Sequence, residues 1–164
     1  MTTPRQLLPP TTVALVKDRP GVLQRIATCC GDKGFNIRSL AVGSSEAEGQ
    51  SRMTFVVDAS TDADQMVSEL KKLEDVIEIK DISTQEFVSR ELALVRIHGG
   101  KEARKRLMDI VDIFHAKVLD VGADSILIEA TGHENTIDSL VRLLKDHAVV
   151  ELVRTGRVSM LRGG

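Results

Sequence analysis

Hydrophobic and polar residues in the first half of the chain follow two spacings, one of two residues and one of three to four. The alternation of two predicts strands, and the longer spacing predicts helices that bury one stripe of side chains. Strands are predicted at 12–16, 37–42, 52–58 and 76–83, and helices from a cap at Asp18 to Gly34 and at 62–73. The predicted order is therefore β-α-β-β-α-β.

The same order recurs from residue 91 onward. Strands are predicted at 92–97, 118–121, 126–130 and 149–153, and helices at 101–114 and 134–145. The period of roughly 80 residues indicates a structural repeat, and residues 84–90 form a short connection. The sequence thus predicts an α+β protein made of two ferredoxin-like βαββαβ units, at 11–84 and 91–160.

Units of this size leave surface that needs a partner. A unit of about 70 residues buries only about 60% of its unfolded surface, and two helices cover only one face of its sheet. The other face or the edge strands must then meet the second half or a second chain. Both arrangements fit the pattern, and a homodimer is favoured.

Composition narrows the function classes. The 164 residues carry a net charge of −2, which gives no reason to expect nucleic acid or an anionic membrane. No apolar stretch approaches the roughly 20 residues of a membrane span, and the N-terminus lacks the apolar core of a signal peptide, so a cytoplasmic protein is expected. The absence of Trp and Tyr disfavours a surface that stacks bases.

Residues that carry catalytic or metal chemistry are scattered. The four histidines lie in different predicted elements, and the adjacent Cys29 and Cys30 form neither a CxxC pair nor a bridge. The densest basic run, 101–106, follows Gly99-Gly100 at a helix start. It could hold an anion or an acidic partner, and a solvated helix face explains it as well. No catalytic centre or metal site is predicted.

The turn at residues 18–22 is a candidate anion site. A helix N-terminus exposes unpaired N–H groups and a partial positive charge. Pro20 has no N–H to offer, whereas Gly21 and Val22 do, and Gly21 lets a ligand approach the backbone closely. A free carboxylate requires such a surface.

An amino group beside that carboxylate would need acceptors, which Asp18 and the amide oxygen of Asn36 can supply. Val22, Leu23 and Ile37 would line an aliphatic hollow, so the set suits an α-amino acid. Capping explains the same polar residues separately, with Asp18 as a helix cap and Asn36 in an Asx-type turn. Local chemistry leaves both interpretations open.

Longer stretches resemble a known family. They are TTVALVKDRPGVLQRIATCCGDKGFNIRSLAVG, SRMTFVVD, DVIEIKDIS, RELALVRI, IVDIFHAKVLDVG and VVELVRTGRVSMLRG. From about Thr12 to the C-terminus they resemble the small regulatory subunit of acetohydroxyacid synthase (acetolactate synthase). The DRPGVL and GFNI segments mark the broader ACT-domain class, and the SRMT segment and TGR tail are more specific to this subunit.

The resemblance implies an N-terminal ACT domain at 11–84 for effector binding and dimerisation, and a C-terminal ACT-like domain at 91–160. It implies a homodimer without catalytic activity that binds the large catalytic subunit, activates it and confers feedback inhibition by branched-chain amino acids, usually valine. It implies no cofactor on this chain, because thiamine diphosphate, Mg and FAD belong to the catalytic subunit. The pathway implied is valine, leucine and isoleucine biosynthesis.

The resemblance also implies an effector site between two chains. Gly21 and Val22 match the backbone donors to the carboxylate, and Asn36 and Ile37 match residues of the facing chain. Asp18 stands where the family often carries Asn, which bears on effector affinity and identity. The second half has 116–118 where the first has Asn36, so no equivalent site is expected there.

Two alternatives belong to other classes. One is a free-standing ACT-domain sensor that regulates transcription or another enzyme, although nothing resembles a DNA-binding segment. The other is an enzyme, which the scattered histidines and carboxylates disfavour.

Overall fold

The computed structural model describes residues 9–99, 101–145 and 147–163. Its contacts divide the chain into two units. One runs up to Val88 and takes in the C-terminal residues from Arg157, and the other is Ser89–Gly156. Among the described residues, no helix is both long and apolar enough to cross a membrane.

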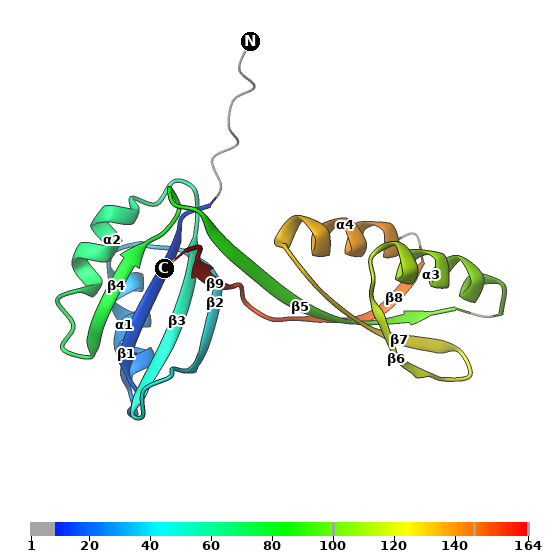
Figure 1. The fold of residues 1–164 in the computed structure, drawn as a ribbon, viewed down its shortest axis with the longest axis horizontal. Helices are drawn as coiled ribbons and strands as arrows, with labels where there is room; N and C mark the ends of the chain where they lie inside the picture. Colours follow the sequence, from blue (N-terminus) through cyan, green and yellow to red (C-terminus); the bar gives the residue numbers. More distant parts are fainter. Residues whose placement is uncertain (1–8, 100, 146, 164) are drawn as a thin grey trace, which may run out of the picture. The chain divides into compact units, whose positions relative to one another are not determined.

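The first unit has the predicted βαββαβ order. Its elements are β1 (Thr11–Lys17), α1 (Val22–Asp32), β2 (Ile37–Ser44), β3 (Gln50–Val57), α2 (Ala63–Leu70) and β4 (Val76–Asp81). The four strands form one antiparallel sheet in the order β2-β3-β1-β4 (Figure 1). The edge strands are therefore β2 and β4.

One face of this sheet and one stripe of each helix form the first core. Helix α1 buries Val22, Ile26 and Cys30, and α2 buries Met66 and Leu70. Alternate residues of the sheet meet them, including Ala14, Val16, Met53, Phe55 and Val57. Because side chains alternate along a strand, the intervening residues lie on the face without helices.

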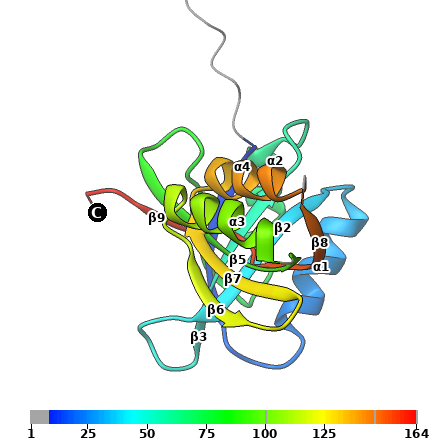
Figure 2. The same cartoon turned by 90° about the vertical axis from the view of Figure 1, so that its right-hand side faces the viewer.

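The second unit repeats the arrangement. Its elements are β5 (Phe87–His98), α3 (Lys101–Ile113), β6 (Lys117–Val121), β7 (Ser125–Gly132), α4 (Glu134–Leu144) and β8 (Ala148–Arg154). The sheet order is β6-β7-β5-β8. Helices α3 and α4 lie side by side over one face (Figure 2), and they bury Leu107, Val111, Ile137, Leu140 and Leu144.

The predicted fold class is confirmed, with two differences in detail. The connection at 84–90 is shorter than expected, because Phe87–Arg90 already belong to β5. A further strand that the sequence did not predict, β9 (Val158–Leu161), follows Arg157 and pairs with β5. Residues 157–160, which the sequence grouped with the second domain, thus have their contacts in the first unit.

Candidate functional site

The turn before α1 is set by a glycine rather than by the predicted aspartate cap. Gly21 is the N-cap with φ of 85°, and no side chain caps the helix. Asp18 lies outside the helix, exposed, and its main-chain N–H donates to Gly49 O at 2.8 Å. The expectation that Asp18 caps the helix is therefore wrong. The positive φ delays the helix until Val22 and leaves its N-terminus to other partners.

Two arginines hold this turn against a buried carboxylate that the sequence interpretation missed. Asp75 is 1% exposed, and it accepts from Arg19 Nε at 2.6 Å and from Arg25 Nε at 2.5 Å. The hydrogen bond from Arg25, followed by that from Arg19, lowers the pKa of Asp75. Lys17 N also donates to the main-chain oxygen of Asp75 at 2.9 Å. The turn is thus fixed at both of its ends.

The guanidinium of Arg25 also lies directly against Gly21. A Cβ on Gly21 would stand 2.8 Å from Arg25 Nη1. The positive φ favours glycine at this position. The guanidinium of Arg25, paired with Asp75, therefore adjoins the uncapped end of α1, where the helix dipole is positive.

The other end of α1 positions Asn36. Gly34, with φ of 73°, ends the helix as predicted, because Phe35 N donates back to Cys30 O at 2.9 Å. The side chain of Asn36 does not bond to its own turn. Its Nδ2 donates to Asp58 Oδ2 at 2.6 Å, and Asp58 N donates to Asn36 O at 3.2 Å. Arg38 Nε approaches the same carboxylate at 3.7 Å.

The predicted site residues form two groups within one chain. Asp18 and residues 21–23 lie at the start of α1, and Asn36 and Ile37 lie past its end. A helix of 11 residues is about 16 Å long at 1.5 Å per residue, so a single chain does not bring the two groups together.

The aliphatic hollow expected from Val22, Leu23 and Ile37 is not formed within one chain. Val22 is 5% exposed and Ile37 packs against the same core. Leu23 is 49% exposed, so it alone of the three presents a largely exposed side chain.

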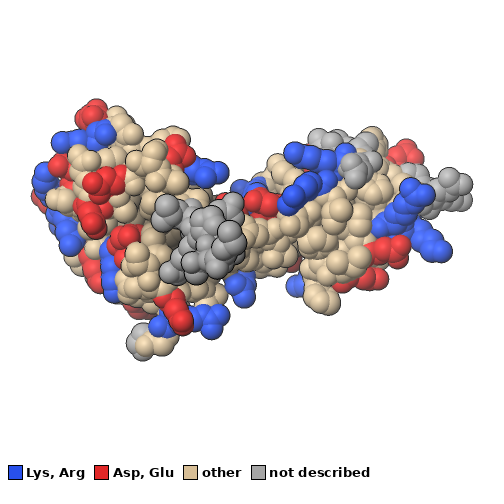
Figure 3. Space-filling view, turned by 90° about the horizontal axis from the view of Figure 1, so that it is seen from above, with Lys and Arg blue, Asp and Glu red and all other residues tan. Residues whose placement is uncertain are grey.

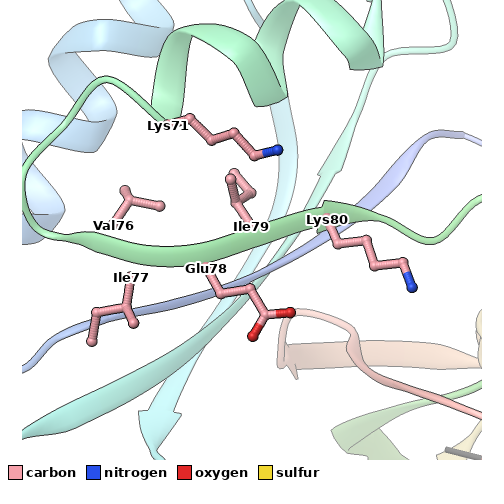
Figure 4. Close-up of a pocket in the computed structure, with 6 residues that line it drawn as sticks. All are labelled: Lys71, Val76, Ile77, Glu78, Ile79 and Lys80. Carbon is pink, nitrogen blue, oxygen red and sulfur yellow. The ribbon is translucent and has the colours of Figure 1, made fainter.

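Two open hollows lie elsewhere on the first unit. One of about 520 Å³ follows β4, lined by Lys71 and residues 76–80. In Figure 4, Val76 and Ile79 point to the side of β4 on which Lys71 lies, and Ile77 and Glu78 point to the opposite side. The other hollow, of about 500 Å³, lies against α1 and Leu73. Neither contains a predicted effector residue.

The basic run at 101–106 has a structural role in part. Arg104 Nη2 donates to Gly122 O at 2.6 Å and to Ala123 O at 2.7 Å, and so holds the turn between β6 and β7. Lys105 and Arg106 are exposed. Gly100 and the side chains of Lys101 and Glu102 lie outside the described residues.

Neither the distribution of charge nor the metal-binding side chains indicate a second candidate site among the described residues. In Figure 3, acidic and basic side chains are interspersed over the first unit, at the left of the view. The described part of the chain holds no group of three or more His, Cys, Asp and Glu side chains that could bind a metal ion.

Comparison with known proteins assigns both units. Residues 13–78 match the family model described as the AHAS small subunit-like ACT domain, and residues 90–163 match the small subunit of acetolactate synthase. The acetolactate synthase small subunit of Mycobacterium bovis is 41% identical over 154 residues, covering 93% of this chain and 92% of that one. The chain belongs to the acetolactate synthase small-subunit family.

Further relatives of this family agree. The small subunit of Bacillus subtilis is 39% identical over 150 residues, covering 90% of this chain and 87% of its own. The crystal structure of the small subunit from Thermotoga maritima superposes with a TM-score of 0.86 at 31% identity, covering 94% of this chain and 98% of that one. The small-subunit family match thus extends over both units, and the predicted family and ACT domain are confirmed.

Proposed function

We propose that this chain is the regulatory, non-catalytic subunit of acetolactate synthase. It binds the catalytic large subunit, raises its activity, and makes it sensitive to inhibition by a branched-chain amino acid, with valine as the first candidate. The observation that carries the proposal is the match of both units to small subunits of this enzyme over 93% of the chain. In this proposal thiamine diphosphate, Mg and FAD belong to the large subunit.

The geometry of the first unit supports an amino-acid site at the start of α1. The helix end has no side-chain cap, and the Val22 N–H makes only a long turn bond to Arg19 O at 3.4 Å. In this proposal the N–H groups of Gly21 and Val22 turn to an incoming carboxylate. The guanidinium of Arg25 lies beside Gly21, with its charge balanced by Asp75. The exposed side chain of Leu23 offers an aliphatic contact to a branched side chain.

The partner chain completes the site in this proposal. Asn36 donates Nδ2 to Asp58, which turns its Oδ1 away from that carboxylate and leaves it as an acceptor for an ammonium group. Since one α1 separates Asn36 from the Gly21 turn, the two meet only when a second copy faces the first. The exposed Asp18 then lies on the side of the ammonium. The working form is a homodimer.

Reconstitution tests the proposal. The purified chain alone is expected to make no acetolactate from pyruvate, and the catalytic subunit is expected to turn over faster when the chain is added. L-valine should then inhibit the mixture and D-valine should not, because only one enantiomer places carboxylate, ammonium and side chain on their three partners. Turnover by the chain alone, or a mixture that behaves like the catalytic subunit, would refute the proposal.

A further inference from the structure

The segment after Gly156 connects the two units a second time. The chain leaves the first unit after Val88, builds the second from Ser89 to Gly156, and re-enters the first at Arg157. We propose that Arg157 is the residue through which effector occupancy at Asn36 and Ile37 is transmitted to the second unit. This inference rests on the proposed function and describes how effector binding in the first unit affects the second.

Arg157 is anchored across three strands of the first sheet. It is 3% exposed, its main-chain N–H donates to Ser39 Oγ at 2.9 Å, and its Nη1 donates to Thr11 Oγ1 at 3.2 Å. Both acceptors stand opposite Val56 in the register, one on each side. The residue therefore spans two strand spacings, about 9–10 Å, on the face without helices.

The anchor on β2 lies next to the effector residues. Ser39 is three positions after Asn36, and the register of β2 against β3 shifts between Ile37 and Ser39. An irregularity of this kind re-aims side chains and is a place where a strand can change its pairing. A ligand that moves Asn36 and Ile37 thus acts on Ser39 through two residues of one strand, and on Arg157 through a hydrogen bond.

The position of Arg157 is closely defined. A buried guanidinium is costly without bonds to its donors, and a slipped tail would lose the bond from Nη1 to Thr11 Oγ1. The far end of the tail is also held, since Arg162 N donates to Glu86 O at 2.9 Å. Movement of Ser39 should therefore move Arg157 and, through the peptide bond between them, Gly156 of the second unit.

Two variants and a control test the coupling in the reconstituted enzyme. Ser39→Ala removes the acceptor on β2, and Arg157→Ala removes the contact with Thr11. Arg162→Ala is the matched control, because the contact of Arg162 comes from its main chain and its side chain is exposed. Calorimetry of the free chain measures valine binding, and acetolactate formation measures inhibition.

We expect both test variants to bind valine within about threefold of wild type while the inhibitory response weakens about fivefold or more, a coupling change of usual size. The control should match wild type in both measurements. An unchanged inhibition curve in Ser39→Ala, which folds without the loss of a buried charge, would overturn the coupling alone. A wild-type enzyme that ignores every branched-chain amino acid would refute the proposed function itself.

Discussion

Replacing Asn36 by alanine tests whether its amide binds the effector or only holds Asp58. The side chain is exposed and makes one described hydrogen bond, from Nδ2 to Asp58 Oδ2 at 2.6 Å. Asn36→Ala removes that bond together with Oδ1, the proposed acceptor for the ammonium of the effector. The main-chain bond from Asp58 N to Asn36 O remains, so the local backbone keeps its anchor.

The two roles predict different magnitudes. A hydrogen bond to a charged group contributes about 1.5–3 kcal/mol, and each 1.4 kcal/mol is about tenfold in affinity. The inhibitory concentration of valine should therefore rise about ten- to a hundredfold. The free energy of unfolding should fall by no more than about 1 kcal/mol, because the lost bond is exposed to water.

The assay is valine titration of the reconstituted enzyme, with urea unfolding of the free chain alongside. Asn135→Ala is a matched control, since Asn135 is an exposed asparagine of α4 in the second unit and should leave both curves unchanged. A wild-type inhibition curve for Asn36→Ala would show that the amide lies outside the site. Loss of activation together with inhibition would assign Asn36 to the fold or to the contact with the catalytic subunit.

Three further predictions concern the first unit. Hydrogen bonds from Arg25 and Arg19 lower the pKa of Asp75 below the unfolded value, so the stabilisation they give is present above about pH 4 and is lost as the pH falls through the lowered pKa. Asp75→Asn should therefore flatten the fall in thermal midpoint between about pH 5 and pH 2. An unflattened profile would contradict this. Burial raises the pKa of Cys30 to about 11, and the residue is 2% exposed. A thiol reagent at neutral pH should therefore react with Cys29 alone in the native protein and with both thiols in denaturant. Rapid reaction of two thiols per native chain would count against the packing of α1. Gly21→Ala should lower the free energy of unfolding by about 1–2 kcal/mol because φ is positive there. Gly43→Ala, where the new Cβ would meet nothing within 4 Å, should lower the free energy of unfolding by less. Equal urea midpoints for the two variants would refute the backbone strain at Gly21.

The elements and the core were predictable because the apolar spacing is regular. The stripe of Val22, Ile26 and Cys30, for example, appears buried as the spacing requires. The start of α1 was less predictable. Aspartate often caps helices, so the sequence favours a helix that begins after Asp18. In the structure the positive φ at Gly21 makes the helix begin at Val22 instead, and no sequence pattern distinguishes these two starting points.

The partners of the site could not be predicted from local patterns. Nothing in the local sequence distinguishes Asp58 and Asp75 from the other carboxylates. Their roles depend on strand pairing, which brings together residues that are far apart in the sequence. Asp75 comes to lie beside Lys17, and Asp58 beside Asn36. Strand β9 was missed because it is only four residues long, the shortest run over which alternation predicts a strand.

The central claim is that two copies of this chain share each amino-acid site. The most direct test mixes Gly21→Ala with Asn36→Ala after subunit exchange and measures valine binding by calorimetry, once each variant alone has been shown to bind weakly. A mixed dimer with shared sites has one site carrying both changes and one carrying neither. About a quarter of all sites in an equal mixture should then recover wild-type affinity. If no site recovers, the Gly21 turn and Asn36 act within the same chain, and the shared site is contradicted.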